Sequence, residues 1–231
     1  MKIGIFTDSH YSSQTLTCGK RFNSRSLVKI RNAYEYFRNC GCELVLCLGD
    51  LIDKEGDHAK EIENLKAVSA VIASSSVPTV CLMGNHDAFT FTVDEFYSIL
   101  GGCIPNNMCI NGKEFVFLDN CYFASGVHYM PGDSDWEDTF YPHIDELKKI
   151  ICSRENDTFV FMHQNIDPAL PEDHRLSNSA EIFELLTSSD KVKAVFQGHY
   201  HPGHVSKYNG IDFITLPAMC ERDDAVYVYD F

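Results

Sequence analysis

One stretch constrains this chain more than any other, an apolar run that ends in two acidic residues. Residues 44–48 are apolar and predict a strand buried on both faces of a sheet. Gly49 allows a sharp turn after it, and Asp50 and Asp53 follow at the carboxyl end of the strand, where open α/β sheets place their ligands. Since aspartate also caps helices, this stretch alone leaves two interpretations open, a ligand site and a helix cap.

Four more apolar runs are predicted strands, and each is followed by residues of the kind that bind metal ions or phosphates. In an extended chain, residues two apart project to the same side, so Asp8 and His10 are predicted to contact one metal ion together. This repetition at successive strand ends favours the ligand-site interpretation. The four runs are residues 2–6, 77–83, 158–162 and 194–197, and they are followed by Asp8 and His10, by Asn85 and His86, by His163, and by His199 and His201.

The segments between these strands predict helices early in the chain and hairpins later. Apolar residues at helical spacing indicate the helices, and two Asn-Gly pairs indicate the hairpins. This mixture predicts an α/β fold in which two mixed β-sheets pack face to face with helices outside. The predicted helices are residues 24–39, 57–73, 92–100, 142–152 and 179–186; the other predicted strands are 108–110, 113–118, 122–124, 205–208, 211–216 and 225–229; the predicted loops are 11–23 and 131–140, which contains Trp136.

Length and composition predict one domain covering residues 1–231. The sequence has 45% hydrophobic residues and contains no linker, repeat or low-complexity tract. No apolar run reaches the roughly 20 residues that span a bilayer. The segment before Thr7 is too short for a signal peptide, so we expect a cytoplasmic protein without a membrane partner.

The cysteines and the net charge further limit the classes of protein to which this chain can belong. None of the ten cysteines forms a Cys-x-x-Cys pair, and several fall inside apolar strands, so reduced thiols are expected. A formal net charge of -14 argues against non-specific binding of nucleic acid. A small phosphorylated substrate remains compatible, because bound metal ions can reverse the local sign of the charge. The sequence leaves the oligomeric state open.

The ordered set of strand ends resembles the calcineurin-like metallophosphoesterase superfamily. The pattern of that superfamily is Asp-x-His, Gly-Asp-x-x-Asp, Gly-Asn-His followed by Asp or Glu, a lone His, and Gly-His-x-His. All five blocks occur here in order between residues 8 and 201. The resemblance implies a four-layer α/β/β/α sandwich made of two mixed sheets flanked by helices.

The resemblance also implies a role for each of these residues. Asp50 would bridge two metal ions, while His86 would face the phosphate and the leaving oxygen without binding metal. Asp53 would hydrogen-bond His86, fixing its tautomer and favouring its charged form. Asp87 is expected to be a structural acid. The implied ligands are Asp8, His10 and His201 for the first ion, and Asn85, His163 and His199 for the second.

This ligand chemistry predicts both the metals and the reaction. Imidazole, carboxylate and amide oxygen suit Mn²⁺, Zn²⁺ and iron as Fe²⁺ or Fe³⁺, whereas Ca²⁺ takes oxygen ligands alone. Two such ions would polarise phosphoryl oxygens, and a hydroxide that bridges them would attack phosphorus. We therefore expect a metal-dependent phosphoric ester hydrolase.

Two departures from related patterns bear on the substrate. Protein Ser/Thr phosphatases carry phosphate-binding arginines where this chain has Lys54 and Met83, so it looks more like bacterial class III cyclic-nucleotide phosphodiesterases. Gln164 stands where those enzymes often have a second histidine. A phosphodiesterase acting on nucleotide-like or other small diesters is the leading hypothesis. A phosphomonoesterase, a nucleotide pyrophosphatase and an inactive binding protein are the alternatives.

The remaining polar candidates are expected to be structural. Arg21 and Arg175 could clamp a second phosphate or a nucleobase, although solvated or salt-bridged side chains are the commoner case. The run 221–224 predicts a solvated turn. The histidines expected at the surface or in the core are His58, His128, His143, His174 and His204.

Overall fold

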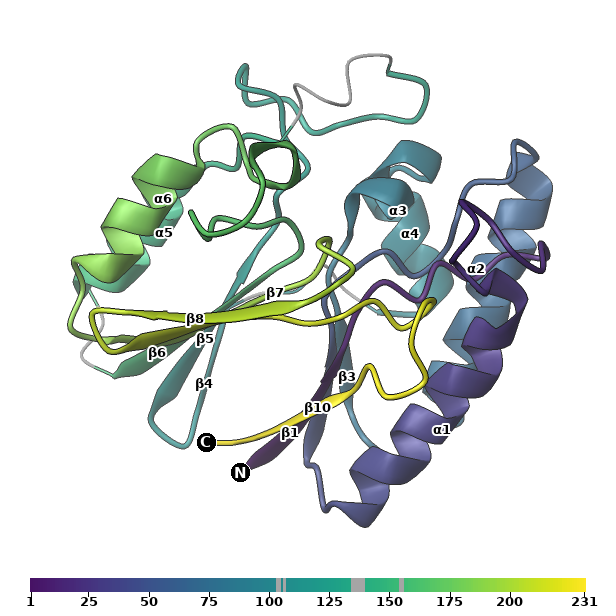
Figure 1. Cartoon of the computed structure of the whole chain (residues 1–231), viewed down its shortest axis with the longest axis horizontal. Helices are drawn as coiled ribbons and strands as arrows, with labels where there is room; N and C mark the ends of the chain where they lie inside the picture. Colours follow the sequence, from purple (N-terminus) through teal and green to yellow (C-terminus); the bar gives the residue numbers. More distant parts are fainter. Residues whose placement is uncertain (103–104, 106, 134–139, 154–155) are drawn as a thin grey trace.

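Two β-sheets pack face to face in the centre of the molecule, and helices cover their outer faces (Figure 1). This is the four-layer α/β/β/α arrangement that the sequence predicts. The computed structural model describes residues 1–102, 105, 107–133, 140–153 and 156–231.

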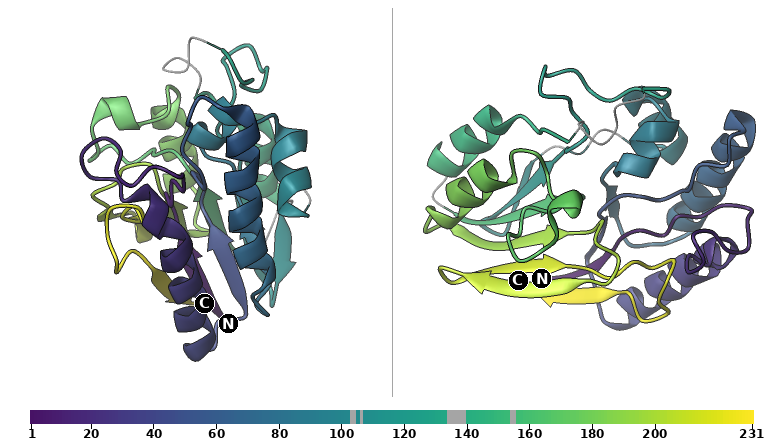
Figure 2. Two further views of the ribbon diagram at one scale, coloured as in Figure 1. Left: turned by 90° about the vertical axis from the view of Figure 1, so that its right-hand side faces the viewer. Right: turned by 45° about the horizontal axis from the view of Figure 1, so that its top comes forward.

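The smaller sheet has four strands in the order β10-β1-β2-β3. The first three strands of the chain are parallel, and β10 pairs antiparallel with β1, so that the two termini lie side by side (Figure 1). Helices α1, α2 and α4 cover its outer face (Figure 2). The elements of this half are β1 (Lys2–Phe6), α1 (Ser26–Asn39), β2 (Leu44–Cys47), α2 (His58–Ala73), β3 (Thr79–Cys81), α3 (Asn85–Thr90), α4 (Val93–Leu100) and β10 (Tyr227–Asp230).

The larger sheet has six strands in the order β4-β5-β6-β7-β9-β8. Its four inner strands run parallel, and the two predicted Asn-Gly hairpins add the antiparallel edges β4 and β8. Helices α5 and α6 cover its outer face (Figure 1). The elements of this half are β4 (Met108–Ile110), β5 (Lys113–Leu118), α5 (Ile144–Ser153), β6 (Asp157–Met162), α6 (Ser179–Thr187), β7 (Val192–Gln197), β8 (His204–Tyr208) and β9 (Ile211–Thr215).

The alternation of side chains along β1 explains how the layers hold together. Ile3 and Ile5 enter the core between the sheets, where they join Phe161 and Phe196 of the larger sheet. Gly4 points the other way, toward α1, and an added Cβ would lie 2.4 Å from the Phe37 ring. The missing side chain therefore lets α1 pack directly onto the sheet.

Three predicted elements differ in the structure, and one short helix was not predicted. Strand β3 is shorter than residues 77–83, and residues 122–124 form only an isolated bridge between Tyr122 and His128. Helix α5 begins two residues after Pro142. Helix α3 was not predicted, because six residues are too few to show a helical period. Trp136 lies outside the described residues, as does most of the loop predicted at 131–140.

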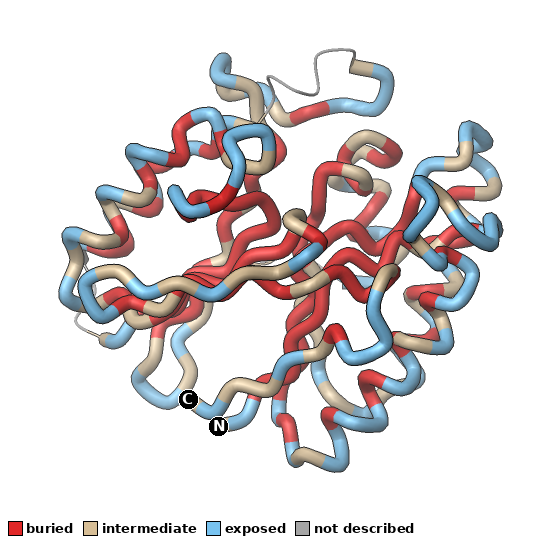
Figure 3. The backbone as a smooth tube through the Cα atoms, viewed as in Figure 1, coloured by how far each residue is buried: buried red, intermediate tan, exposed pale blue. Residues whose placement is uncertain are grey.

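The carboxyl ends of β1, β2 and β3 meet those of β6 and β7 at one edge of the two sheets. This edge is buried, although it carries the polar residues that follow the strands (Figure 3). The nine cysteines in the described ranges are free thiols. Across those ranges, no helix has both the length and the apolar character needed to cross a membrane.

Candidate metal centre

The structure brings all seven predicted metal ligands together at this edge. Six of them are buried, and His199 is partly exposed. They come from both sheets, so the site depends on the packing of one sheet against the other. The seven are Asp8, His10, Asp50, Asn85, His163, His199 and His201.

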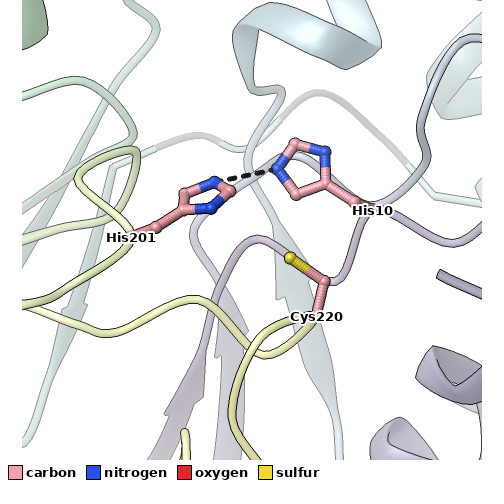
Figure 4. Close-up of side chains that lie close together, drawn as sticks. All are labelled: His10, His201 and Cys220. Carbon is pink, nitrogen blue, oxygen red and sulfur yellow. Dashed lines mark hydrogen bonds between the residues drawn. The ribbon is translucent and has the colours of Figure 1, made fainter. Parts of the chain in front are cut away.

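The first group of ligand atoms consists of Asp8 Oδ1, His10 Nε2, His201 Nε2 and Asp50 Oδ2. The two imidazole nitrogens are 3.2 Å apart (Figure 4). His10 Nε2 lies 3.4 Å from Asp50 Oδ2, and Asp8 Oδ1 lies 3.4 Å from His201 Nε2 and 3.6 Å from His10 Nε2. Ligands about 2.1 Å from one ion are separated by roughly 3.0–3.4 Å, so these atoms have the spacing of a coordination shell.

The second group consists of Asn85 Oδ1, His163 Nε2, His199 Nδ1 and again Asp50 Oδ2. Asn85 Oδ1 lies 3.0 Å from each of the two imidazole nitrogens. His163 Nε2 lies 3.2 Å from Asp50 Oδ2. One carboxylate oxygen, Asp50 Oδ2, therefore belongs to both groups.

The hydrogen bonds around the two groups fit bound cations. Asp8 Oδ1 is buried without a hydrogen-bond partner among the described residues. His163 Nδ1 donates to Leu48 O at 2.9 Å, and His201 Nδ1 lies 2.5 Å from Glu221 Oε1. In both rings Nε2 is then left as an acceptor aimed into the site. This nitrogen and oxygen donor set matches the metals expected from the sequence.

The backbone at the strand ends is unusual, and it corrects one step of the sequence argument. Asp8, His10, Asp50 and His199 all have left-handed φ angles, between 42° and 64°. Asp8 and His10 do not therefore lie on an extended chain, as their spacing suggested. Their side chains meet because the backbone turns at both residues, a strain of the kind that concentrates at functional sites.

Two glycines allow the close approach on which the site depends. Gly49 has φ +112°, and a Cβ there would lie 2.7 Å from Gly84 N. A Cβ at Gly84 would lie 2.2 Å from Asp50 Oδ1. Both glycines therefore let β2 and the start of α3 meet around Asp50.

His86 and Asp53 form the pair implied by the resemblance. His86 Nδ1 lies 2.9 Å from Asp53 Oδ1, and the His86 backbone N–H donates to Asp50 Oδ1 at 2.9 Å. Burial alone would raise the pKa of Asp53, but the nearby imidazole of His10 and the close contact with His86 hold it well below its usual range. The expectation that Asp53 favours the charged form of His86 is wrong on balance, because burial, together with the nearby His10, lowers the pKa of His86 despite the two carboxylates. Ligand atoms of His86, His10 and Asp50 also lie within 4.8 Å of one another, so the non-ligand role of His86 stays a prediction.

Without metal ions, protons bound to histidines supply the positive charge of the site. Burial alone would lower the pKa of His10, but the carboxylates of Asp53 and Asp8, 3.7 Å and 3.6 Å from its ring nitrogens, raise it to about 9. The negative charge of Asp50 likewise outweighs burial at His163 and raises its pKa to about 9. At His199, burial and the neighbouring His163 lower the pKa to about 3.

Asp87 ties the two strand ends together. Its carboxylate accepts the backbone N–H groups of Gly84 and Leu51 at 3.0 Å and of Ile52 at 3.2 Å. The bond from Gly84 is half of a capping box at the start of α3. This is the structural position expected for Asp87.

Glu221 is a site residue that the sequence reasoning missed. The prediction of a solvated turn is wrong at this position, since the Glu221 side chain is 16% exposed and binds His201. Lys20 Nζ lies 3.2 Å from the same Oε1. Nothing in the local pattern separates Glu221 from the exposed acids beside it.

Three further residues lie closer to the site than expected. The Cys220 sulfur lies within 4.8 Å of ligand nitrogens of His10 and His201 (Figure 4). The His174 ring lies 5.5 Å from the His199 ring. Arg21 is salt-bridged, with Nη1 3.5 Å from Asp53 Oδ1, while Arg175 pairs with a neighbouring residue of its own loop.

The chain belongs to the calcineurin-like phosphoesterase family, whose sequence model matches residues 1–203. It is similar to the 3',5'-cyclic adenosine monophosphate phosphodiesterase CpdA of Haemophilus influenzae, with 27% identity over 191 residues, 77% of this chain and 61% of that protein. It is also similar to a probable cyclic nucleotide phosphodiesterase of a Pseudoalteromonas species, with 23% identity over 145 residues, 61% of this chain and 50% of that protein. The chain thus spans between half and two thirds of the length of these relatives.

Solved structures confirm the fold. A dimetal phosphatase from Danio rerio superposes with a TM-score of 0.82 at 17% identity, covering 98% of this chain and 91% of that one. A purple acid phosphatase from yellow lupin superposes with a TM-score of 0.59 at 13% identity, covering 93% of this chain and 43% of that one. At these identities the likeness concerns the calcineurin-like fold alone.

Proposed function

We propose that this chain is a dinuclear metal-dependent phosphodiesterase that acts on small, nucleotide-like phosphodiesters. The observation that carries the proposal is the position of Asp50 Oδ2, which lies within 3.4 Å of ligand atoms in both groups. A single oxygen shared in this way is suited to bridging two ions. Family membership and the names of the two relatives support the reaction class.

Bound ions would supply Lewis acidity toward phosphoryl oxygens and toward water. The protein itself sets the tautomers of the ligands through Leu48 O and Glu221 Oε1, so that His163 and His201 present Nε2 to the site. Burial alone would raise the pKa of Asp8 and Asp50, but in the metal-free protein neighbouring histidines outweigh it and lower the pKa of both, so that both are ionised. The ligands are therefore arranged before any substrate arrives.

His86 is the candidate proton donor to the leaving oxygen. Its side chain is 19% exposed and lines a cleft with Asp50, Arg21 and His201. Asp53 contacts Nδ1, so a proton given to the leaving oxygen would come from Nε2. Removing Asp53 would therefore misorient the His86 ring, and it would also remove a carboxylate 3.7 Å from Nδ1 of His10, a candidate metal ligand.

The surroundings favour a diester over a monoester. Lys54 Nζ sits 3.8 Å from the centre of the Phe89 ring, and Met83 is buried. Neither position aims a cation at a phosphate, and Arg21 is already paired with Asp53. A monoester dianion needs more positive charge than a singly charged diester, so this cleft suits the diester better.

One observation favours a nucleotide pyrophosphatase as the second candidate. Lys20 and Arg21, both from the loop that follows β1, line the same cleft as His86. A second phosphate could be held by these two cations if it replaced their present partners, Glu221 for Lys20 and Asp53 for Arg21. A dinucleotide-type diphosphate belongs in the substrate panel for this reason.

The test is a substrate panel on one Mn²⁺-loaded preparation at pH 7 to 8. Bis-nitrophenyl phosphate and a cyclic nucleotide should show higher kcat/KM than mono-nitrophenyl phosphate, and phosphoserine peptides should react slowly. Asp50→Asn serves as the control for contaminating activity. A clear preference for the monoester would overturn the diesterase assignment, and a preference for the diphosphate would favour the second candidate.

A further inference from the structure

A cavity of about 750 Å³ opens directly beside the second group of ligands. Asn85 and His199 form one wall, and the segment between β6 and α6 forms another. Phe140 contributes an aromatic ring, 6.4 Å from the ring of His199. A molecule held at the metal centre by its phosphate could therefore extend into this cavity.

Gln164 lines the cavity, and its amide lacks partners. The residue is 1% exposed, and neither Oε1 nor Nε2 hydrogen-bonds to any described residue. The buried Cys121 thiol interacts with Gln164, but sulfur is a weak hydrogen-bonding partner. Because buried polar groups are almost always satisfied in native proteins, an amide in this state points to a ligand.

The chemistry of the wall defines the class of that ligand. A glutamine amide presents one acceptor and one donor side by side, and nucleobase edges present the complementary pair. Phe140 offers a ring on which a planar group can stack. The wall also carries Glu172, Asp173 and Arg175; because Arg175 pairs with Glu172, the charge of Asp173 remains and disfavours a second anionic group. A neutral, planar, hydrogen-bonding group satisfies all three conditions.

We propose that this cavity binds the nucleobase of the substrate, with the Gln164 amide paired to the base edge. The assignment rests on the proposed function for the position of the phosphate. It goes beyond that function because it makes Gln164 the residue that separates diesters with a base from diesters without one.

The first test compares two substrates on Gln164→Leu, which keeps the size of the side chain and removes both hydrogen-bonding atoms. The kcat/KM for a cyclic nucleotide should fall about 10- to 100-fold further than that for bis-nitrophenyl phosphate, the range expected for a lost bidentate pair. The loss should lie mainly in KM. Gln14→Leu, at an exposed loop position, is the matched control and should leave the ratio of the two substrates unchanged. Equal losses for both substrates in Gln164→Leu would overturn the proposal.

The second test needs neither metal nor turnover. Adenosine, which has a base but no phosphate, should bind metal-free protein in a calorimetric titration, and Gln164→Leu should weaken that binding at least tenfold. If Gln164→Leu is misfolded by circular dichroism, Gln164→Glu replaces it, since it loses the donor alone and should weaken binding as well. Binding of adenosine without hydrolysis of any diester would sink the proposed function and keep the base site. Absence of adenosine binding to the wild type would overturn the base site and leave the proposed function standing.

Discussion

Replacing Glu221 tests whether the site depends on groups that touch no metal. Its carboxylate oxygen lies 2.5 Å from His201 Nδ1, and His201 is a ligand in the first group only. Losing such a supporting carboxylate typically costs 10- to 100-fold in metal affinity. The lower end is expected here, about tenfold, because Lys20 shares the same oxygen and the Glu221 side chain is 16% exposed.

The assay is a competition titration of Glu221→Ala against a chromophoric chelator. One of the two Mn²⁺ ions should be released at a roughly tenfold lower concentration of free chelator than in the wild type. The concentration that releases the other ion should be unchanged. Asp224→Asn is the matched control, since Asp224 lies in the same turn, is exposed and pairs only with Arg222 among the described residues. Unchanged release of both ions, or equal weakening of both, would refute this account of Glu221.

Two further predictions concern His86 and the metal-free site. His86→Ala should retain both metals and lose roughly 10²- to 10⁴-fold in rate with a poor leaving group, and less with nitrophenolate; loss of a metal in elemental analysis would instead make His86 a ligand. In the metal-free protein, His10 and His163 have a pKa of about 9 against an ordinary 6.5, so the folded state holds these protons more tightly than the unfolded state. Their stabilisation is fully present below pH 6.5 and lost as pH rises through 9; the melting temperature should fall across that window, and a flat profile in thermal scans would contradict it.

Much of the fold was predictable because its strands and helices carry strong local signals. Largely apolar runs marked β1, β2, β6 and β7, and Asn-Gly turns marked both hairpins. Helix α3 was missed since its six residues include the polar Asn85, His86 and Asp87, whose positions are set by the site and by the capping bond to Gly84. The helix propensities of these residues do not reflect that tertiary constraint.

Only the part of the candidate site that follows the ends of strands was predictable from the sequence. The seven candidate ligands could be named because they follow strands in the order of the superfamily pattern that the sequence resembles. Glu221 could not, because its contact with His201 joins the segment after β9 to the end of β7 and leaves no spacing rule. The cavity around Gln164 was also hidden, since its walls come from separate parts of the chain. Asp8 and His10 lie together as predicted, but not because they are two apart on an extended chain. Both have left-handed φ angles, and the turn of the backbone brings their side chains together.

The central claim is that Asp50 joins two groups of ligands into one dinuclear site, and metal stoichiometry tests it most directly. Elemental analysis of Mn²⁺-loaded protein should approach two ions per chain. Asp50→Asn should bind neither ion firmly, because the shared carboxylate contributes to both groups. A firm value of one or zero ions in the wild type would contradict the dinuclear account.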